Sequence, residues 1–130
     1  MTTRTELSLA DARVQAVAQD GDCLRVCFEE YFLYIALSGS DQQTKWRQSG
    51  SLVLEQARIV AGAPGAGLLA GGDVQDNACT YRDRVPLPLD SRGQVGCVLR
   101  FHGRDEPLRI QAARIRLQPT DERRYVAHVT

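Results

Sequence analysis

Apolar residues fall on every second position in three runs near the end of the chain. The runs cover residues 95–101, 108–112 and 115–117, and a polar break at residues 103–107 separates the first two. Side chains that alternate in this way lie on opposite faces of a β-strand, whereas an amphipathic helix repeats every three or four residues. The pattern therefore predicts three successive antiparallel strands, each with one buried face.

The first part of the chain predicts a β-hairpin. Alternating apolar positions lead into Asp20-Gly21-Asp22, and Asp-Gly is a strong turn signal because glycine accepts the positive φ that a tight turn requires. The return strand alternates over residues 24–28 and is followed by an apolar run at residues 31–37. That run is either a strand covered on both faces or a continuation of the return strand across a bulge at Glu29-Glu30. The residues expected in the core are Val26, Phe28, Leu99, Phe101, Ile110 and Ile115.

The middle of the chain carries weaker signals. Residues 38–51 are polar and predict a loop, with at most a short edge segment around Trp46, and residues 52–60 predict a further strand. Residues 61–81 are dense in glycine and alanine. They predict a long loop, which in a compact domain is either functional or loosely packed.

Two prolines limit the next segment. Pro86 and Pro88 confine residues 85–89 to an edge strand or an irregular extended segment, because proline cannot donate to a sheet ladder. Residues 125–129 predict the last strand. Together these elements predict an all-β fold, a single antiparallel β-sandwich or flattened barrel of about seven or eight strands, in one domain over residues 1–130.

The composition and the first residues of the chain indicate where in the cell the protein is expected. A hydrophobic fraction of 43% and a charged fraction of 25% are typical of soluble globular proteins. No apolar run approaches the ~18 residues of a membrane span. Arg4 and Glu6 interrupt the region where a signal peptide would be apolar. We therefore expect a cytoplasmic protein that makes no membrane contact.

The charges balance over the whole chain but not within it. Sixteen basic and sixteen acidic residues cancel, which argues against a dedicated nucleic-acid or anionic-membrane protein. Residues 1–90 carry eight basic and twelve acidic side chains, and residues 91–130 carry eight basic and four acidic. Lys45 is the only lysine among the sixteen basic residues. That preference for arginine either serves bidentate anion recognition or reflects codon usage.

The four cysteines are Cys23, Cys27, Cys79 and Cys97. Cys23 and Cys27 lie four residues apart in a predicted strand, so they are separated by about 13 Å and cannot share a metal ion without a bend. Cys97 falls in the apolar register of its strand, where a free thiol behaves as a small hydrophobe. We expect reduced structural thiols and no metal site.

The glycine-rich segment contains the one motif of a known cofactor site. Gly65-Ala66-Gly67-Leu68-Leu69-Ala70 matches the dinucleotide fingerprint Gly-x-Gly-x-x-Gly/Ala. Gly71-Gly72 would end the required helix after one turn, and Leu68-Leu69 stand where a Walker phosphate loop needs lysine and serine or threonine. We expect no cofactor. The alternative is an enzyme that uses residues 62–72 to bind a small molecule or a nucleotide.

Catalytic patterns are sparse. His102 and His128 alternate with core positions and are expected at the surface, and no Gly-x-Ser-x-Gly elbow is present. We therefore predict no catalytic residue, and surface recognition remains. Arginines at alternate positions of the C-terminal strands predict a cationic sheet face, which loop residues would extend with flat, rigid side chains. The candidate binding residues are Trp46, Tyr81, Arg82, Arg100, His102, Arg114 and Arg116.

Several short segments resemble small bacterial all-β proteins of no assigned activity. The resemblance covers most of the chain and consists of strand and turn segments. They are Ala12-Arg13-Val14, Asp22-Cys23-Leu24-Arg25-Val26-Cys27-Phe28, Trp46-x-Gln48 before Leu52-Val53-Leu54, Val85-Pro86-Leu87-Pro88-Leu89, Phe101-His102-Gly103 and Arg124-Tyr125-Val126. It implies the fold and a bacterial cytoplasmic setting, and it implies no residue role.

The function expected from these observations is that of a non-enzymatic binding or assembly module. Its partner is another protein or a second copy of the chain, held through a sheet edge or the polar face, so that a homodimer or another homo-oligomer forms. Nucleic acid and membrane are not among the expected partners.

Overall fold

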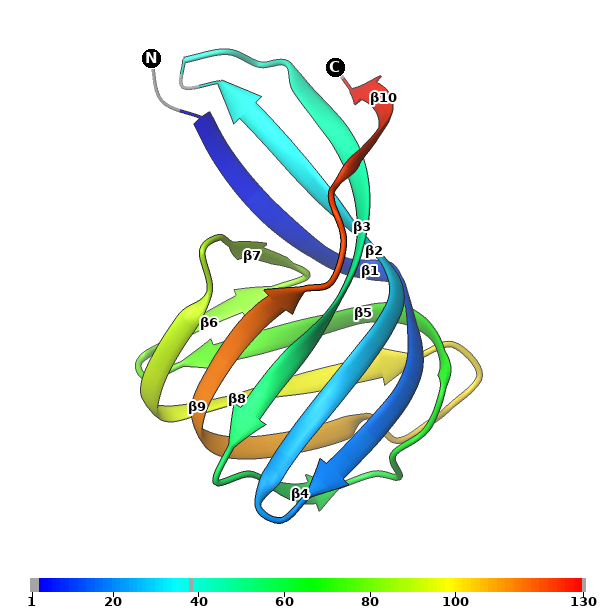
Figure 1. Ribbon diagram of the computed structural model, residues 1–130, viewed down its shortest axis with the longest axis vertical. Coiled ribbons are helices and arrows are strands. Elements are labelled where there is room, and N and C mark those ends of the chain that lie inside the picture. The colour runs from blue at the N-terminus through cyan, green and yellow to red at the C-terminus, as the bar shows by residue number, and fades with distance from the viewer. Residues whose placement is uncertain (1–2, 38, 130) are drawn as a thin grey trace.

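The computed structural model describes residues 3–37 and 39–129, and this part of the chain is built from β-strands without a helix (Figure 1). The all-β prediction is confirmed. The strands are β1 (Thr3–Asp20), β2 (Cys23–Leu37), β3 (Gln43–Glu55), β4 (Arg58–Ala61), β5 (Gly67–Asp76), β6 (Cys79–Arg82), β7 (Arg84–Pro86), β8 (Asp90–Phe101), β9 (Leu108–Pro119) and β10 (Arg124–Val129).

Six of the strands close into an antiparallel barrel. Each pairs with two neighbours in the cyclic order β1, β2, β3, β9, β8, β5, and β5 returns to β1. The prediction of a sandwich or flattened barrel with seven or eight strands is therefore corrected to a closed six-stranded barrel with four additional strands. Closure follows from the length of β3, whose residues 50–55 reach β9 and remove the sheet edge that a sandwich would leave.

The first three strands are longer than the barrel and extend beyond one end of it as an open, curled sheet (Figure 1). In this extension β7 pairs with the start of β1, and β10 pairs with the start of β3. We call this sheet the arm. It consists of residues 3–8, 31–37 and 43–48 together with β7 and β10, in the order β7, β1, β2, β3, β10.

The predicted hairpin and core are confirmed. The turn between β1 and β2 contains Gly21 with a φ of 61°. All six residues expected in the core are buried: Val26, Phe28, Leu99, Phe101, Ile110 and Ile115. The register between β2 and β3 shifts between Phe28 and Tyr31, which is the predicted bulge, and at this point β2 passes from the barrel into the arm.

The segments 38–51 and 61–81 were both predicted as loops; residue 38 lies outside the described residues, and residues 39–51 and 61–81 are largely strand. Residues 43–51 belong to β3, and residues 67–76 form the barrel strand β5. The glycines that made the second segment look like a loop are required by close packing. A Cβ at Gly72 would lie 2.8 Å from the carbonyl oxygen of Val98, and one at Gly71 would lie 2.5 Å from the Asp83 carboxylate.

The boundaries of the other predicted strands differ less from those in the structure. The strand expected at residues 52–60 is divided, because β3 ends at Glu55 and β4 begins at Arg58. The two runs predicted within residues 108–117 form the single strand β9, and the change in alternation occurs where the β8–β9 register shifts between Arg92 and Val95. Residues 84–86 form a short strand on β1, and the last strand is present as β10.

Within residues 3–37 and 39–129, no helix has the length and apolar character needed to cross a membrane.

Candidate functional site

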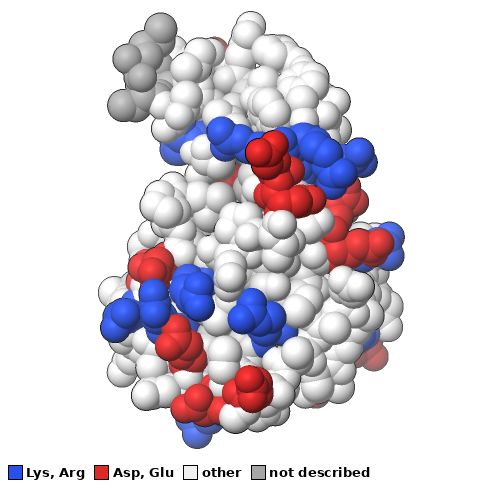
Figure 2. Space-filling model, in the orientation of Figure 1, with Lys and Arg blue, Asp and Glu red and all other residues white. Residues whose placement is uncertain are grey.

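A cleft of about 810 Å³ lies where the arm meets the barrel. We call it the waist cleft. One wall is the inner face of the arm, and the opposite side comes from the chain before β8 and the end of β9. In the view of Figure 2, charged side chains gather in a band between the arm and the barrel, and the visible surface of the arm is largely uncharged. The cleft is lined by Thr5, Leu33, Trp46, Gln48, Leu87, Pro88, Leu89, Leu117, Pro119, Asp121, Glu122 and Arg123.

Trp46 is the only tryptophan of the chain, and its position in the cleft is well defined. Its indole Nε1 donates a hydrogen bond of 2.8 Å to the hydroxyl oxygen of Thr44. Tyr125 faces Trp46 across the β3–β10 pair, edge-on, with ring centroids 5.4 Å apart. The guanidinium carbon of Arg123 lies 5.7 Å from the centre of the Trp46 ring, within the range of a cation–π contact.

A chain of hydrogen bonds fixes the side of the cleft next to β9. The buried Tyr31 hydroxyl donates to Gln48 Oε1 at 2.7 Å, and Gln48 Nε2 donates to the Asp121 carbonyl oxygen at 2.9 Å. Burial, followed by the charge of Asp121, raises the pKa of Tyr31 above its ordinary range, so this phenol remains a donor. Both ends of the Gln48 amide are thus occupied within the protein.

Residues 121–123 form one lip of the cleft. Asp121 Oδ1 accepts the Ser49 backbone N–H at 2.8 Å, and Asp121 Oδ2 lies 3.5 Å from Arg124. These contacts hold the Asp121 carboxylate. In the part of the chain that the structure describes, neither Glu122 nor Arg123 makes an ion pair. Arg123 is located by its contact with Trp46.

The arm ends in an edge strand. β10 pairs with β3 on one side and is the terminal strand of the sheet order among the described strands. Tyr125 and Val126 on β10 are 56% and 41% exposed. The register shifts between Tyr125 and Ala127, so Val126 has no direct partner on β3. This end of the arm combines an unpaired backbone edge with exposed apolar side chains.

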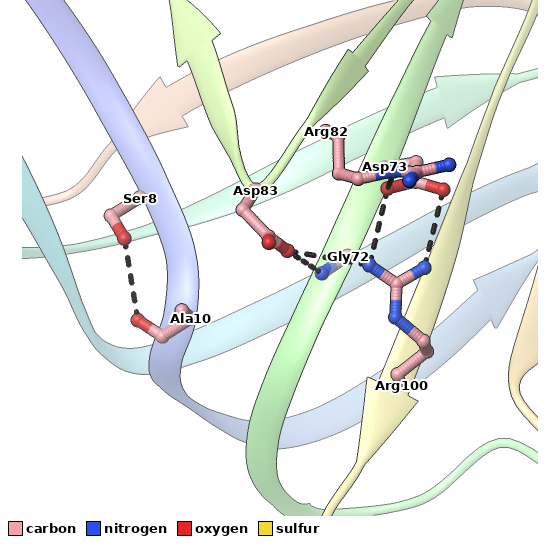
Figure 3. A network of polar contacts seen from close by, with 7 residues as sticks. All are labelled: Ser8, Ala10, Gly72, Asp73, Arg82, Asp83 and Arg100. Atoms are coloured by element: carbon pink, nitrogen blue, oxygen red, sulfur yellow. Dashed lines mark hydrogen bonds and ion pairs between the residues drawn. The ribbon is translucent and has the colours of Figure 1, made fainter.

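The predicted residues Arg82 and Arg100 lie in a different region, on the barrel (Figure 3). Arg100 makes two hydrogen bonds of 3.2 Å to the Asp73 carboxylate and a third, of 3.3 Å, to Asp83. The hydrogen bond to Asp73 is the main cause that raises the pKa of Arg100. Arg82 Nε lies 3.8 Å from Asp73. Arg100 is therefore neutralised by two carboxylates, whereas the side chain of Arg82 is 80% exposed beside the Asp73 carboxylate.

Arg114 and Arg116 on β9 are paired as well. Arg114 donates two hydrogen bonds of 2.9 Å to Asp90 and one of 3.1 Å to Glu55. The same bonds to Asp90 raise the pKa of Arg114 and lower that of the carboxyl. Arg116 Nε lies 3.8 Å from Glu55. Three of the arginines in residues 91–130, Arg100, Arg114 and Arg116, are thus paired with carboxylates from residues 1–90.

The remaining candidate binding residues, Tyr81 and His102, lie outside the waist cleft and make no ion pair with the arginines described above. Tyr81 lies on β6, next to Cys79, whose hydrogen bond to the phenol is the main cause that raises the pKa of Tyr81. His102 is exposed in the turn after β8. Of the seven candidate binding residues, Trp46 alone lines the waist cleft. The structure therefore does not assemble the seven into one surface.

The cysteines and the glycine-rich segment have structural surroundings. Cys97 is buried in β8, and desolvation raises its pKa to about 12, while Cys79 is exposed. In the described ranges, no group of three or more histidine, cysteine, aspartate or glutamate side chains is arranged to hold a metal ion. Gly67 begins strand β5, and the residues after it continue that strand, so residues 62–72 lack the helix of a phosphate-binding loop.

Most residues of the cleft carry no signal in the sequence that would predict their role. Arg123 and the chain before β8 were not predicted to contribute, and Tyr125 was identified only as part of a strand. The sequence did contain one indication. Trp46 and Tyr125 each lie in a largely polar segment, and aromatic residues commonly face each other across neighbouring strands. Neither a scan against protein-family models nor searches against curated proteins and solved structures gave a match.

Proposed function

We propose that the protein is a non-enzymatic assembly module that associates with a second copy of itself through the free edge of β10. The observation that carries this proposal is the edge itself. β10 ends the sheet order and exposes Tyr125 and Val126 beside it. An edge strand leaves outward-facing N–H and C=O groups that another strand can pair, and exposed apolar side chains add buried area when it does.

A second copy suits this edge. When two β10 strands pair antiparallel about a two-fold axis, the free backbone N–H and C=O groups of both strands form hydrogen bonds. No free β10 edge remains, so the assembly stops at a dimer. The formal net charge of the chain is zero, so two copies approach without net repulsion. β10 carries no carboxylate, and its two exposed apolar residues lie next to each other.

The other end of the sheet is less suited. β4 is the terminal strand there, but it has four residues and one strongly exposed large apolar side chain, Val60 at 43%. Short edges are a common way to prevent unwanted pairing. Leu37, Tyr125 and Val126, the other strongly exposed large apolar residues in the described part of the chain, all belong to the arm. The arm is therefore the favoured interface.

The chemistry of the cleft is consistent with a role in binding and not in catalysis. Neither histidine and none of the cysteines lines the waist cleft. A cytoplasmic location belongs to the same proposal, because the four cysteines are unpaired thiols, which suits a reducing compartment.

Sedimentation velocity of matched edge variants tests the proposal. We expect the wild type to form dimers, and we expect Val126→Lys to raise the dimer dissociation constant by about tenfold or more, because the two-fold axis brings like charges together. Val60→Lys is the control, since Val60 has nearly the same exposure on the other edge. It should leave the dissociation constant unchanged. A wild type that stays monomeric at all concentrations would contradict the proposal, as would a dimer that only Val60→Lys dissociates.

A further inference from the structure

We propose that the waist cleft binds an amphipathic small molecule whose apolar body packs on Trp46 and whose single anionic group binds Arg123. This site adjoins the dimer edge, because Tyr125 of β10 contacts the Trp46 ring, but the ligand does not pair with the backbone of β10 and its binding does not require self-association.

The cleft has the dimensions and surface of a small-molecule site. Its volume of about 810 Å³ lies within the range of ligand pockets, which are mostly apolar with a few polar groups. The apolar lining comes from separate parts of the chain: Leu33, Trp46, Leu87, Pro88, Leu117 and Pro119. Leu33 is already buried, and a ligand that fills this space removes the exposed parts of the other side chains from water, which provides most of the binding free energy.

The lining polar groups are not equally free to bind. Both ends of the Gln48 amide are used by Tyr31 and by the Asp121 carbonyl oxygen. The Asp121 carboxylate accepts the Ser49 N–H and faces Arg124. These hydrogen bonds fix both groups in the wall of the cleft, and neither group supplies a positive charge for an anion.

Arg123 is different because it is positioned and also free. Its guanidinium lies 5.7 Å from the centre of the Trp46 ring, and it makes no ion pair with the described residues. A guanidinium offers a planar fork of donors that fits a carboxylate or another oxyanion. An anionic group held there would leave the attached apolar body against Trp46. Glu122 also lines the cleft, but no contact among the described residues fixes its carboxylate, so an anionic group is favoured over a cationic one.

The single tryptophan makes the test direct. Decanoate, decanol and decyltrimethylammonium, each below its critical micelle concentration, are titrated into the protein while Trp46 fluorescence is recorded, and calorimetry provides a second measurement. We expect saturable binding of decanoate with a change in fluorescence, and weaker binding of the other two. Arg123→Gln should weaken decanoate binding by about tenfold, the loss of one charge-assisted contact, and leave decanol binding unchanged.

Controls separate this proposal from general hydrophobic binding and from self-association. Arg109→Gln removes an exposed arginine of the barrel outside the cleft and should not affect decanoate binding. Val126→Lys, the variant expected to dissociate the dimer, should bind decanoate as the wild type does. The proposal is overturned if decanoate gives no saturable signal, if the three compounds bind equally, or if Arg123→Gln and Arg109→Gln have the same effect.

Discussion

Phe101 shows how one side chain joins several parts of the barrel. It is 4% exposed, its ring lies against Gly67 of β5, and the Arg104 guanidinium covers it at 4.1 Å from the ring centre. A Cβ at Gly67 would lie 2.9 Å from the Phe101 ring, so the two positions fit each other closely. The ring is therefore part of the contact that holds β5 on β8.

Replacing this ring by a methyl group tests the core. We expect Phe101→Ala to lower the free energy of unfolding by about 3 to 5 kcal/mol, because the transfer free energy is lost and a cavity remains. Urea unfolding followed by circular dichroism provides the measurement, with His102→Ala as the exposed control on the next residue. A loss below about 1 kcal/mol for Phe101→Ala would contradict the burial assigned to β8.

The cysteines differ in reactivity for a physical reason. Burial raises the pKa of Cys97 to about 12, so its thiol stays protonated and inaccessible at neutral pH, whereas Cys79 is exposed. We expect iodoacetamide to modify Cys79 in the native protein and Cys97 only after unfolding in urea. Mass spectrometry of peptides over a time course measures both rates. Equal rates for the two cysteines in the native protein would be incompatible with this structure.

At the level of elements, Asp83 connects three strands from the short link between β6 and β7. Its backbone N–H donates to the Gly72 carbonyl oxygen of β5 at 2.7 Å, and its carbonyl oxygen accepts the Leu9 N–H of β1 at 2.8 Å. Its carboxylate accepts the Gly72 N–H at 2.9 Å and the Arg100 guanidinium of β8 at 3.3 Å. The residue also has a φ of 63°, which aspartate and asparagine tolerate better than most residues do.

Two substitutions at Asp83 distinguish the contribution of the carboxylate to stability from that of the backbone conformation. Asp83→Gly keeps the positive φ but removes the acceptor, and we expect it to lower the free energy of unfolding by about 1 to 3 kcal/mol. Asp83→Asn keeps an acceptor oxygen and tolerates the same φ, so its loss should be smaller. Thermal and urea unfolding measure both variants. If the two variants are equally destabilised, the acceptor does not contribute in the way described.

The elements that could be predicted from the sequence are those with one face in the barrel core. Residues 95–101 alternate because every second side chain is buried in the apolar core, and the turn at Gly21 carries its own local signal. β5 could not be recognised as a strand from the sequence. Its glycines are needed because Val98 and Asp83, which are distant in the sequence, pack closely against them. The first half of β3 was missed because the arm has no second layer, so its side chains are half-buried and polar.

The candidate site was less accessible to prediction than the fold. Trp46 was identified as a binding residue, but the cleft around it is formed by residues from β1, β2, β3, the chain before β8 and the segment after β9. Of the arginines expected in a cationic face, Arg100, Arg114 and Arg116 are paired with Asp73, Asp90 and Glu55. Since no local pattern records which carboxylate faces which arginine, charge counted along the chain gave no guide to free charge on the surface.

On the scale of the whole molecule, the protein has two parts, the barrel and the arm, which differ in how their backbone hydrogen-bonding groups are paired. The barrel satisfies its own backbone through a closed ring of six strands, whereas the arm is an open sheet that ends in β7 on one side and in β10 on the other. A closed ring leaves no edge of its own, so a further strand adds at a strand outside the ring, and β10 has two strongly exposed large apolar side chains where β4 has one. The proposed dimer and the proposed ligand site both involve the arm, one at its edge and one at its inner face.

Amide hydrogen exchange as a function of protein concentration tests the central claim, the pairing of β10 with a second copy, most directly. Exchange in β10 should slow as the concentration rises, because pairing protects the N–H groups of the edge, while exchange in β4 should stay the same. Val126→Lys should remove the concentration dependence in β10. Exchange in β10 that is independent of concentration in the wild type, or slowing confined to β4, would contradict the account.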